Sequence, residues 1–258
     1  MSIASGTATT RSKMKRTRCG ASGECLHRVI ICIFLLMACV ATACSEDLYS
    51  MEKVKAQPGA DFPSSLVSAV NPEGFRVFTH MDKQKLVICE IFWARAIHGQ
   101  EVRDKSAKLL YPALRQGDFL GVIHFAITQR YVREYRTQIF KPGYYTMRYV
   151  LSPQGEAGKD PVDFALLSPV ALDHNPARLV PRDIMLQRGR ATSHTKRPAV
   201  MSLPETDPDQ PYPSLTTDDE GTSTLQVKLR LNPHQRVTPQ ELSLALTVIT
   251  AIPEDLGD

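Results

Sequence analysis

The sequence of 258 residues lacks the short motifs by which many enzymes are recognised. It has no Gly-x-Ser-x-Gly element for a serine nucleophile, no His-Glu-x-x-His pair for zinc, and neither the GxGxxG nor the GxxxxGKS/T loop that binds phosphates. These absences favour a protein without catalytic activity and without a cofactor. Acidic pairs such as Asp160 with Asp163 keep a hydrolase open as the alternative, because the two acids of a glycosidase come from distant segments.

Cysteine is scarce once the first 43 residues are set aside, since only Cys44 and Cys89 remain. Two cysteines exclude a disulfide-stapled fold, although one bridge between them stays open if Cys44 is unmodified. Cys89 lies in an apolar segment, where a thiol is inert, so it is a poor candidate for a nucleophile.

Net charge is also small outside the N-terminal region. Six of the 31 basic residues and one of the 27 acidic residues precede residue 44, so the rest of the chain is nearly neutral and indicates no nucleic-acid partner. With 43% hydrophobic and 22% charged residues, the composition is that of a globular protein. It excludes a collagen, a coiled coil, a wholly disordered chain and a multi-pass membrane protein.

The longest apolar run covers residues 29–43, VIICIFLLMACVATA, and is preceded by a basic stretch. A membrane-spanning helix needs about 20 apolar residues, so this run is short for one. A basic flank, a short apolar stretch and a small-x-small site such as Ala41-Thr42-Ala43 are typical of a secretory signal peptide. We therefore expect residues 1–43 to be removed, with Met14 as a more natural start than residue 1.

Cys44 follows the small residues directly, as the modified cysteine does in the lipobox of bacterial lipoproteins. If Cys44 carries lipid, it anchors the protein to a membrane, in the periplasm or at the outer membrane surface. Simple secretion and an uncleaved single-pass anchor are the alternatives.

The pattern of the remaining residues predicts an antiparallel sheet. Residues 44–61 are polar and predict a flexible tether, and residues 62–71 predict a short helix with Pro63 in its first turn. Strands are expected at residues 74–78, 85–94, 119–128, 144–151, 163–167 and 199–203, with a helical turn or two at 181–187.

The clearest alternation of apolar and polar residues lies in 224–231 and 242–249, which predict a hairpin with one buried face. Its loop holds a Thr-Pro-Gln-Glu sequence that resembles a capping box, which indicates a helical turn. Ten of the 18 prolines lie between Leu151 and Pro213, which limits sheet there to short or edge strands. The expected fold is mainly β: one antiparallel β-sandwich over residues 62–251, with one or two short helices, long Pro-rich loops and a tail at 252–258.

Tyrosine and arginine gather between residues 130 and 149. Both are favoured at recognition surfaces, so the candidate ligand-binding residues are Tyr144, Tyr145, Arg148 and Tyr149. The alternative is that alternate tyrosines pack the core. An envelope protein or a glycan is the expected ligand.

Histidine offers weaker candidates for a metal site. Asp173, His174 and His194 lie in the Pro-rich region and could converge on an ion, but scattered loop histidines are usually solvated, so no metal is favoured.

The segment 142–149, PGYYTMRY, resembles the G-x-Y-T-x-R-Y element of a family of uncharacterised bacterial secreted proteins and lipoproteins. Further segments fit that family in the same order, at residues 74–77, 91–93, 121–125, 163–169 and 198–204. The resemblance covers roughly residues 62–250 and implies a secreted domain with no assigned reaction and no catalytic residue to transfer. Residues and resemblance together predict an exported binding or structural module of the cell envelope, with a secreted hydrolase or metal-dependent enzyme as the alternative.

Overall fold

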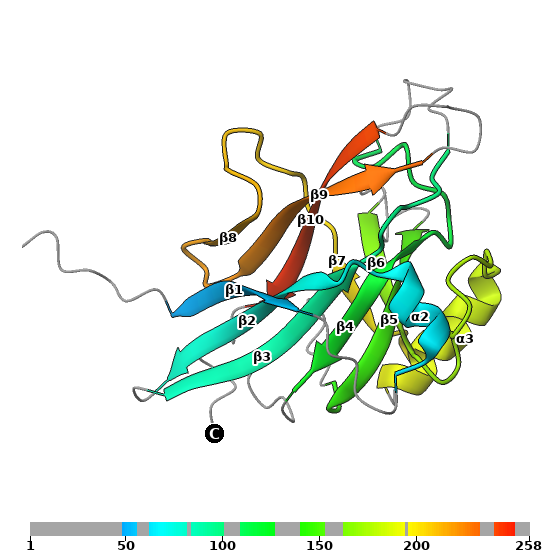
Figure 1. Ribbon diagram of the computed structural model, residues 1–258, viewed down its shortest axis with the longest axis horizontal. Coiled ribbons are helices and arrows are strands. Elements are labelled where there is room, and N and C mark those ends of the chain that lie inside the picture. Colours follow the sequence, from blue (N-terminus) through cyan, green and yellow to red (C-terminus); the bar gives the residue numbers. More distant parts are fainter. Residues whose placement is uncertain are drawn as a thin grey trace, which may run out of the picture. The chain divides into compact units, whose positions relative to one another are not determined.

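Ten β-strands in two antiparallel sheets make up most of the regular structure (Figure 1). The computed structural model describes residues 48–55, 62–81, 84–100, 109–126, 140–152, 162–193, 196–232 and 240–250. The chain divides into two units, Met1–Glu46 and Asp47–Asp258, and all described residues belong to the second. The predicted signal peptide, Cys44 and the tail 252–258 lie outside the described residues. None of the described helices is long and apolar enough to span a membrane.

The larger sheet is curled, and each of its strands pairs with its neighbour in the chain. Its strands are β1 (Tyr49–Lys55), β2 (Glu73–Met81), β3 (Gln84–Trp93), β4 (Phe119–Phe125), β5 (Gly143–Ser152), β6 (Val162–Pro169) and β7 (Val200–Ser202). β2 to β7 confirm the strands predicted from the sequence. Gly121 permits the close pairing of β4 with β3, because a Cβ there would lie 2.4 Å from the Phe92 carbonyl oxygen.

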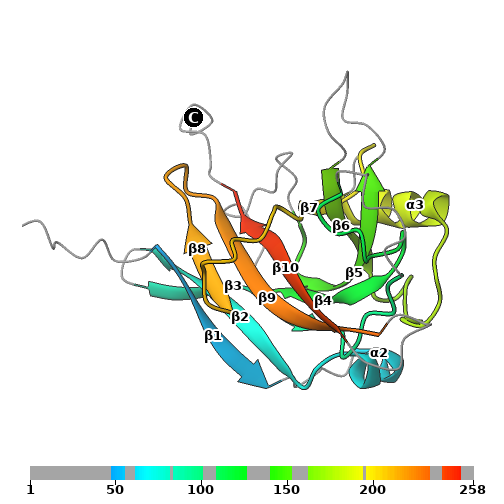
Figure 2. The same ribbon diagram turned by 90° about the horizontal axis from the view of Figure 1, so that it is seen from above.

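The smaller sheet has the order β10-β9-β8, with β8 at Ser214–Thr217, β9 at Ser223–Leu231 and β10 at Gln240–Ile249. β9 and β10 form the predicted hairpin, with Val227 opposite Leu244 and Leu225 opposite Leu246. The turn expected in its loop lies outside the described residues. Figure 2 shows this sheet over one face of the larger one, and the two sheets meet where β10 contacts β7 and β8 contacts β1.

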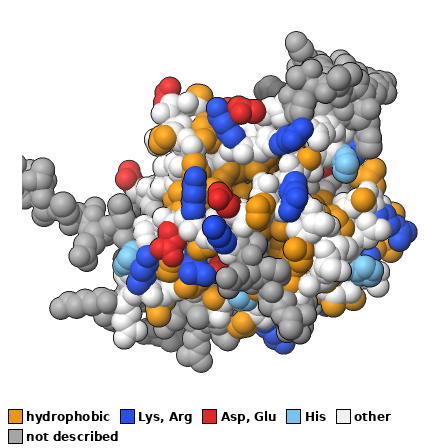
Figure 3. Space-filling model, viewed as in Figure 1, with side chains coloured by type: hydrophobic (Ala, Val, Ile, Leu, Met, Phe, Trp, Pro, Cys, Tyr) orange, Lys and Arg blue, Asp and Glu red, His pale blue; other side chains and the backbone are white. Residues whose placement is uncertain are grey.

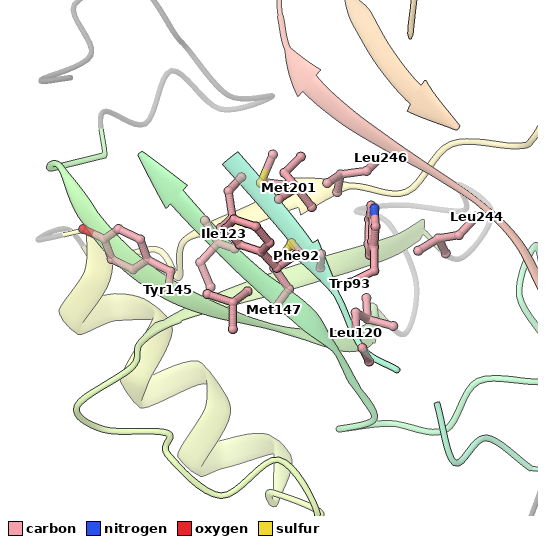
Figure 4. Close-up of a cluster of buried hydrophobic side chains, with 14 of the residues drawn as sticks. Phe92, Trp93, Leu120, Ile123, Tyr145, Met147, Met201, Leu244 and Leu246 are labelled. Atoms are coloured by element: carbon pink, nitrogen blue, oxygen red, sulfur yellow. The ribbon is translucent and has the colours of Figure 1, made fainter. Parts of the chain in front are cut away.

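The main hydrophobic core is shared by the two sheets. Ile91, Ile123 and Met147 of the larger sheet and Leu244 and Leu246 of β10 are all fully buried. Figure 4 shows side chains from both sheets directed into this common interior. The alternation predicted for β9 and β10 therefore reflects one face turned toward the core.

A second, smaller hydrophobic cluster lies where α3 (Arg182–Ser193) packs against β6. The sequence predicted no second core and only a turn or two of helix at 181–187. The helix instead continues through Gly189, where an added Cβ would lie 2.9 Å from Cβ of Pro198. A residue without a side chain lets α3 pass close to the chain before β7, and this contact is not visible in the local pattern. The other described helix, α2 (Ser64–Ala69), follows Pro63 as predicted.

The tether predicted at residues 44–61 is wrong for residues 49–55, which form β1 at the edge of the larger sheet. Tyr49, Met51 and Val54 are partly buried against the core, whereas the two lysines and Glu52 are exposed, as an edge strand allows. These three apolar residues do not keep a strict two-residue alternation, so the segment gave no clear strand signal. The compact unit accordingly begins before residue 62.

Asp163 is a buried carboxyl group that should make stability depend on pH. It is fully buried, its Oδ1 accepts a hydrogen bond from the Tyr149 hydroxyl, and its Oδ2 has no partner among the described residues. Burial raises the pKa of Asp163. A folded-state pKa above the unfolded value gives stability that is fully present below the unfolded pKa, about 4, and is lost as the pH rises through the folded pKa.

We therefore expect Asp163→Asn to remove one component of the pH dependence of unfolding. Urea unfolding of both proteins, followed by circular dichroism from about pH 4 upward, measures the difference between them. The advantage of the wild type over the variant should shrink as the pH rises. Parallel curves for the two proteins would contradict a raised pKa at this position.

Candidate functional site

Arg148, a predicted ligand-binding residue, lies in the interior and is 1% exposed. Its Nε lies 2.6 Å from Oδ2 of Asp173, and its Nη2 lies 3.0 Å from Oδ1. The remaining N–H groups donate to the carbonyl oxygens of Gly117, Asn175 and Arg178 at 2.8 to 3.0 Å. Since all five donors are engaged, no N–H of Arg148 is left to bind a ligand, and the prediction for this residue is not supported.

Tyr145 and Tyr149 also belong to the core. They are 7% and 2% exposed, and their hydroxyls donate to the Lys141 carbonyl and to Asp163. Burial raises the pKa of both tyrosines. The alternative interpretation of the tyrosine cluster, alternate side chains packing the core, describes these two residues. Tyr131 and Tyr135 lie outside the described residues.

Tyr144 ends a row of polar side chains that crosses five strands. The register places Glu52, Arg76, Glu90, His124 and Tyr144 opposite one another on β1 to β5. Arg76 approaches Glu90 to 2.5 Å, His124 approaches Glu90 to 3.2 Å, and the His124 and Tyr144 rings stack at 4.2 Å. In Figure 3, acidic and basic side chains mingle on the face where Figure 1 draws β1 to β3.

The hydrogen bond from His124 is the main cause that lowers the pKa of Glu90, with a further contribution from Arg76. The row is thus a ladder of cross-strand pairs that compensate one another's charge. Its arrangement accounts for Tyr144 without a ligand.

The weak candidates for a metal do not form a site in the described part of the chain. Asp173 is 3% exposed, binds Arg148, and also accepts from Thr146 and pairs with Arg188 at 3.1 Å. Its neighbour His174 is exposed on the loop. His194 lies outside the described residues. Among the residues described, no cluster of three potential metal ligands is present.

One hydroxyl–imidazole pair has the spacing of a nucleophile and its base. Ser50 Oγ of β1 lies 2.7 Å from His80 Nε2 of β2. A hydrolase needs a third group to orient the imidazole and a pocket for the substrate. Within the described residues no carboxylate pairs with His80, and neither residue lines a cavity described below. The Cys89 thiol is no better candidate, because burial raises its pKa.

A concave feature with residues suited to binding opens between the two sheets. We call it the inter-sheet cleft, and its volume is about 410 Å³. Its principal lining residues come from both sheets and the segments beside them: Lys53, Asn71, Phe75, Trp93, Tyr212 and Lys228. This volume lies within the range of small-molecule sites, about 300–1,000 Å³.

Aromatic and cationic groups lie close together in the inter-sheet cleft. Trp93 is 2% exposed and its indole N–H has no hydrogen-bond partner in the described structure. Phe75 and Tyr212 are half-buried. Lys228 Nζ lies 5.4 Å from the centroid of the Tyr212 ring and 3.5 Å from Glu241, and Lys53 is exposed on β1. The cleft thus combines apolar rings with two ammonium groups and one carboxylate, the exposed Glu73 of β2.

Comparisons with protein-family models, with curated proteins and with solved structures found no match to the chain. The resemblance to a family of secreted proteins therefore stays a prediction.

Sequence reasoning missed the residues of the inter-sheet cleft. Lys53 lay in the supposed tether, and Tyr212 lies in the Pro-rich region beside the unpredicted strand β8. The sequence showed Lys228 as a polar residue of a strand with alternating residues. That it lines the same cleft as Phe75 and Trp93 depends on how the two sheets meet. No local signal could have brought these residues together.

Proposed function

We propose that this protein is an exported, non-catalytic binding module of the cell envelope, built as a β-sandwich, whose ligand occupies the inter-sheet cleft. The observation that carries this proposal is the cleft itself, an open hollow lined by aromatic side chains, two lysines and one glutamate. The shared core and the contacts between the sheets at β7–β10 and β1–β8 support the sandwich. The N-terminal sequence pattern supports export.

The chemistry of the cleft favours a segment of acidic glycan. Aromatic faces such as those of Phe75 and Tyr212 stack on the apolar faces of sugar rings, while Lys53 and Lys228 complement carboxylate groups. Lys228 already pairs with Glu241, but both side chains are at least half exposed, so this pair is weak and exchangeable.

The absence of catalysis is supported by how the candidate groups are used. Asp173 is held by two arginines, and Arg148 has no free donor. The Ser50–His80 pair lies away from the cleft lining. An acidic glycan would therefore be bound without being cleaved, and its turnover by the purified domain would contradict the proposal.

Trp93 is the only tryptophan of the chain and lines the cleft, so its fluorescence should report occupancy. We expect a uronic-acid oligosaccharide to change the emission of the domain 47–258 in a saturable way, and a neutral glucan of equal length to bind more weakly. Lys53→Gln combined with Lys228→Gln should weaken the acidic ligand by about tenfold or more, since charge-assisted hydrogen bonds are lost.

Arg230→Gln is the matched control, because Arg230 is an exposed cation on the same strand as Lys228 but outside the cleft lining. Binding that is equally strong for acidic and neutral oligosaccharides, or that is insensitive to the double substitution, would refute the assignment. Saturable binding of an acidic peptide instead of the glycan would identify a protein ligand in its place.

Export is tested by the intact mass of the mature protein from a bacterial host. Cleavage after Ala43 should make Cys44 the N-terminal residue of the mature protein. If Cys44 is lipidated, the mass should be higher by that of a diacylglycerol group. An unmodified mature chain in the medium supports simple secretion. The complete 258-residue chain in the cytosol would overturn the proposal of export.

A further inference from the structure

A second concave site, distinct from the inter-sheet cleft, is lined by arginines. Its volume is about 380 Å³, and no residue lines both sites. The residues that matter for its chemistry are Arg115, Gly117, Asp118, Arg148 and Arg178. We call it the arginine cavity.

Arg148 gives the arginine cavity its position and part of its positive charge. Through its bonds to the carbonyls of Gly117 and Arg178, it joins the loop before β4 to the loop after β6. Because residues of both loops line the cavity, a buried and fully bonded side chain connects two parts of its wall. Arg148 therefore acts by positioning the walls and not as a donor to a ligand.

The donors available to a ligand come from Arg115 and Arg178. Arg115 is half-buried and binds Asp118 through Nη2 at 3.1 Å. Its Nε is buried and has no hydrogen-bond partner among the described residues, so only its terminal N–H groups can face a ligand. Arg178 is exposed, and no partner of its guanidinium is found in the described part of the chain. Asp118 is 2% exposed and accepts from both the side chain and the backbone N–H of Arg115, so its charge is already compensated.

The charges around the cavity do not cancel. Three guanidinium groups line the cavity, on Arg115, Arg148 and Arg178, and Asp118 is the carboxylate among the lining residues. Arg115 pairs with Asp118 and Arg148 pairs with Asp173, so Arg178 leaves a local excess of one positive charge. A phosphomonoester carries about −1.5 to −2 charges near pH 7, and guanidinium groups match its oxygen atoms in geometry.

We propose that the arginine cavity is a binding site for a phosphomonoester, with Arg178 and Arg115 as its donors. The volume exceeds what a single phosphate group fills, which leaves space for a small polar substituent. A phosphorylated polyol should accordingly bind more tightly than inorganic phosphate, and a monocarboxylate should bind more weakly than either.

Isothermal titration calorimetry of the domain 47–258 with inorganic phosphate, glycerol 3-phosphate and acetate, at constant ionic strength, tests the proposal. We expect affinity in the order glycerol 3-phosphate, phosphate, acetate, and weaker binding at higher salt. Equal affinity for phosphate and glycerol 3-phosphate, equal affinity for acetate, or no binding of phosphate or glycerol 3-phosphate would each overturn it.

Arg178→Gln should weaken the binding of glycerol 3-phosphate by about tenfold or more, because one charge-assisted donor is lost. Since Arg178 is exposed and its side chain supports no other group, this variant should fold normally, and its melting temperature without ligand checks that it does. Arg230→Gln, an exposed arginine outside the cavity, is the matched control. Unchanged affinity in Arg178→Gln would refute the site.

The Lys53→Gln and Lys228→Gln double variant separates the two sites. It should retain the affinity for glycerol 3-phosphate while losing the acidic oligosaccharide. If it lost both ligands together, the phosphate would bind at the inter-sheet cleft and the arginine cavity would be excluded.

Discussion

Replacing Arg148 with methionine should lower the free energy of unfolding by about 3–5 kcal/mol, because breaking a buried ion pair leaves its partner charge uncompensated. Asp173 would keep Thr146 and Arg188, but the carbonyls of Gly117, Asn175 and Arg178 would lose their donor. Urea unfolding followed by circular dichroism measures the loss.

Lys228→Met is the matched control for Arg148→Met, since it removes a cation from an exposed pair and should cost no more than about 1 kcal/mol. Combining Arg148→Met with Asp173→Asn should cost less than the sum of the two single changes, because both remove one interaction. Additive effects, or a stable Arg148→Met protein, would show that the buried pair does not hold the structure as described.

Trp93→Ala should destabilise the protein by a similar amount, about 3–5 kcal/mol, because a large buried ring is replaced by a cavity. Trp93 is 2% exposed and projects from β3 toward the side on which Leu244 of β10 lies (Figure 4). The loss therefore falls on the interface between the two sheets. The variant has no tryptophan, so its unfolding must be followed by circular dichroism.

Trp93→Phe separates packing from the indole N–H. That N–H has no partner in the described part of the chain, so its removal should cost little beyond the lost ring volume, and Trp93→Phe should be far more stable than Trp93→Ala. Leu48→Ala, at a side chain that is 49% exposed, should be close to neutral and provides the baseline. Equal losses in the alanine and phenylalanine variants would mean that the indole N–H has a bonding role.

The fold could be predicted from the sequence where one face of a strand packs against the hydrophobic core. Apolar alternation located β9 and β10 because one set of their side chains packs the shared core. β1 was missed because its apolar residues, Tyr49, Met51 and Val54, do not alternate strictly with polar ones. The full length of α3 was missed because its continuation depends on Gly189 fitting against Pro198. The pattern of apolar and polar residues indicates which side chains are buried. It does not indicate which segments pair at the edge of a sheet.

The sites were less predictable than the fold. The Tyr/Arg cluster was correctly singled out as unusual, but its arginine is compensated by Asp173, which is distant in sequence and reachable only through the fold. The residues of the inter-sheet cleft and the arginine cavity come from segments far apart in the chain. These residues are brought together by the fold, and their spacing in the sequence does not indicate that they lie close together.

The start of β1 at Tyr49 sets how far the domain could stand from a bilayer. If Cys44 carries lipid, five residue steps separate it from the first strand, a span of at most about 18 Å. The flexible tether predicted at residues 44–61 would instead have let the domain rotate freely at a distance from the lipid headgroups. With so short a connection, the start of β1 would stay within about 18 Å of the lipidated cysteine, so the domain would meet its ligands close to the membrane surface.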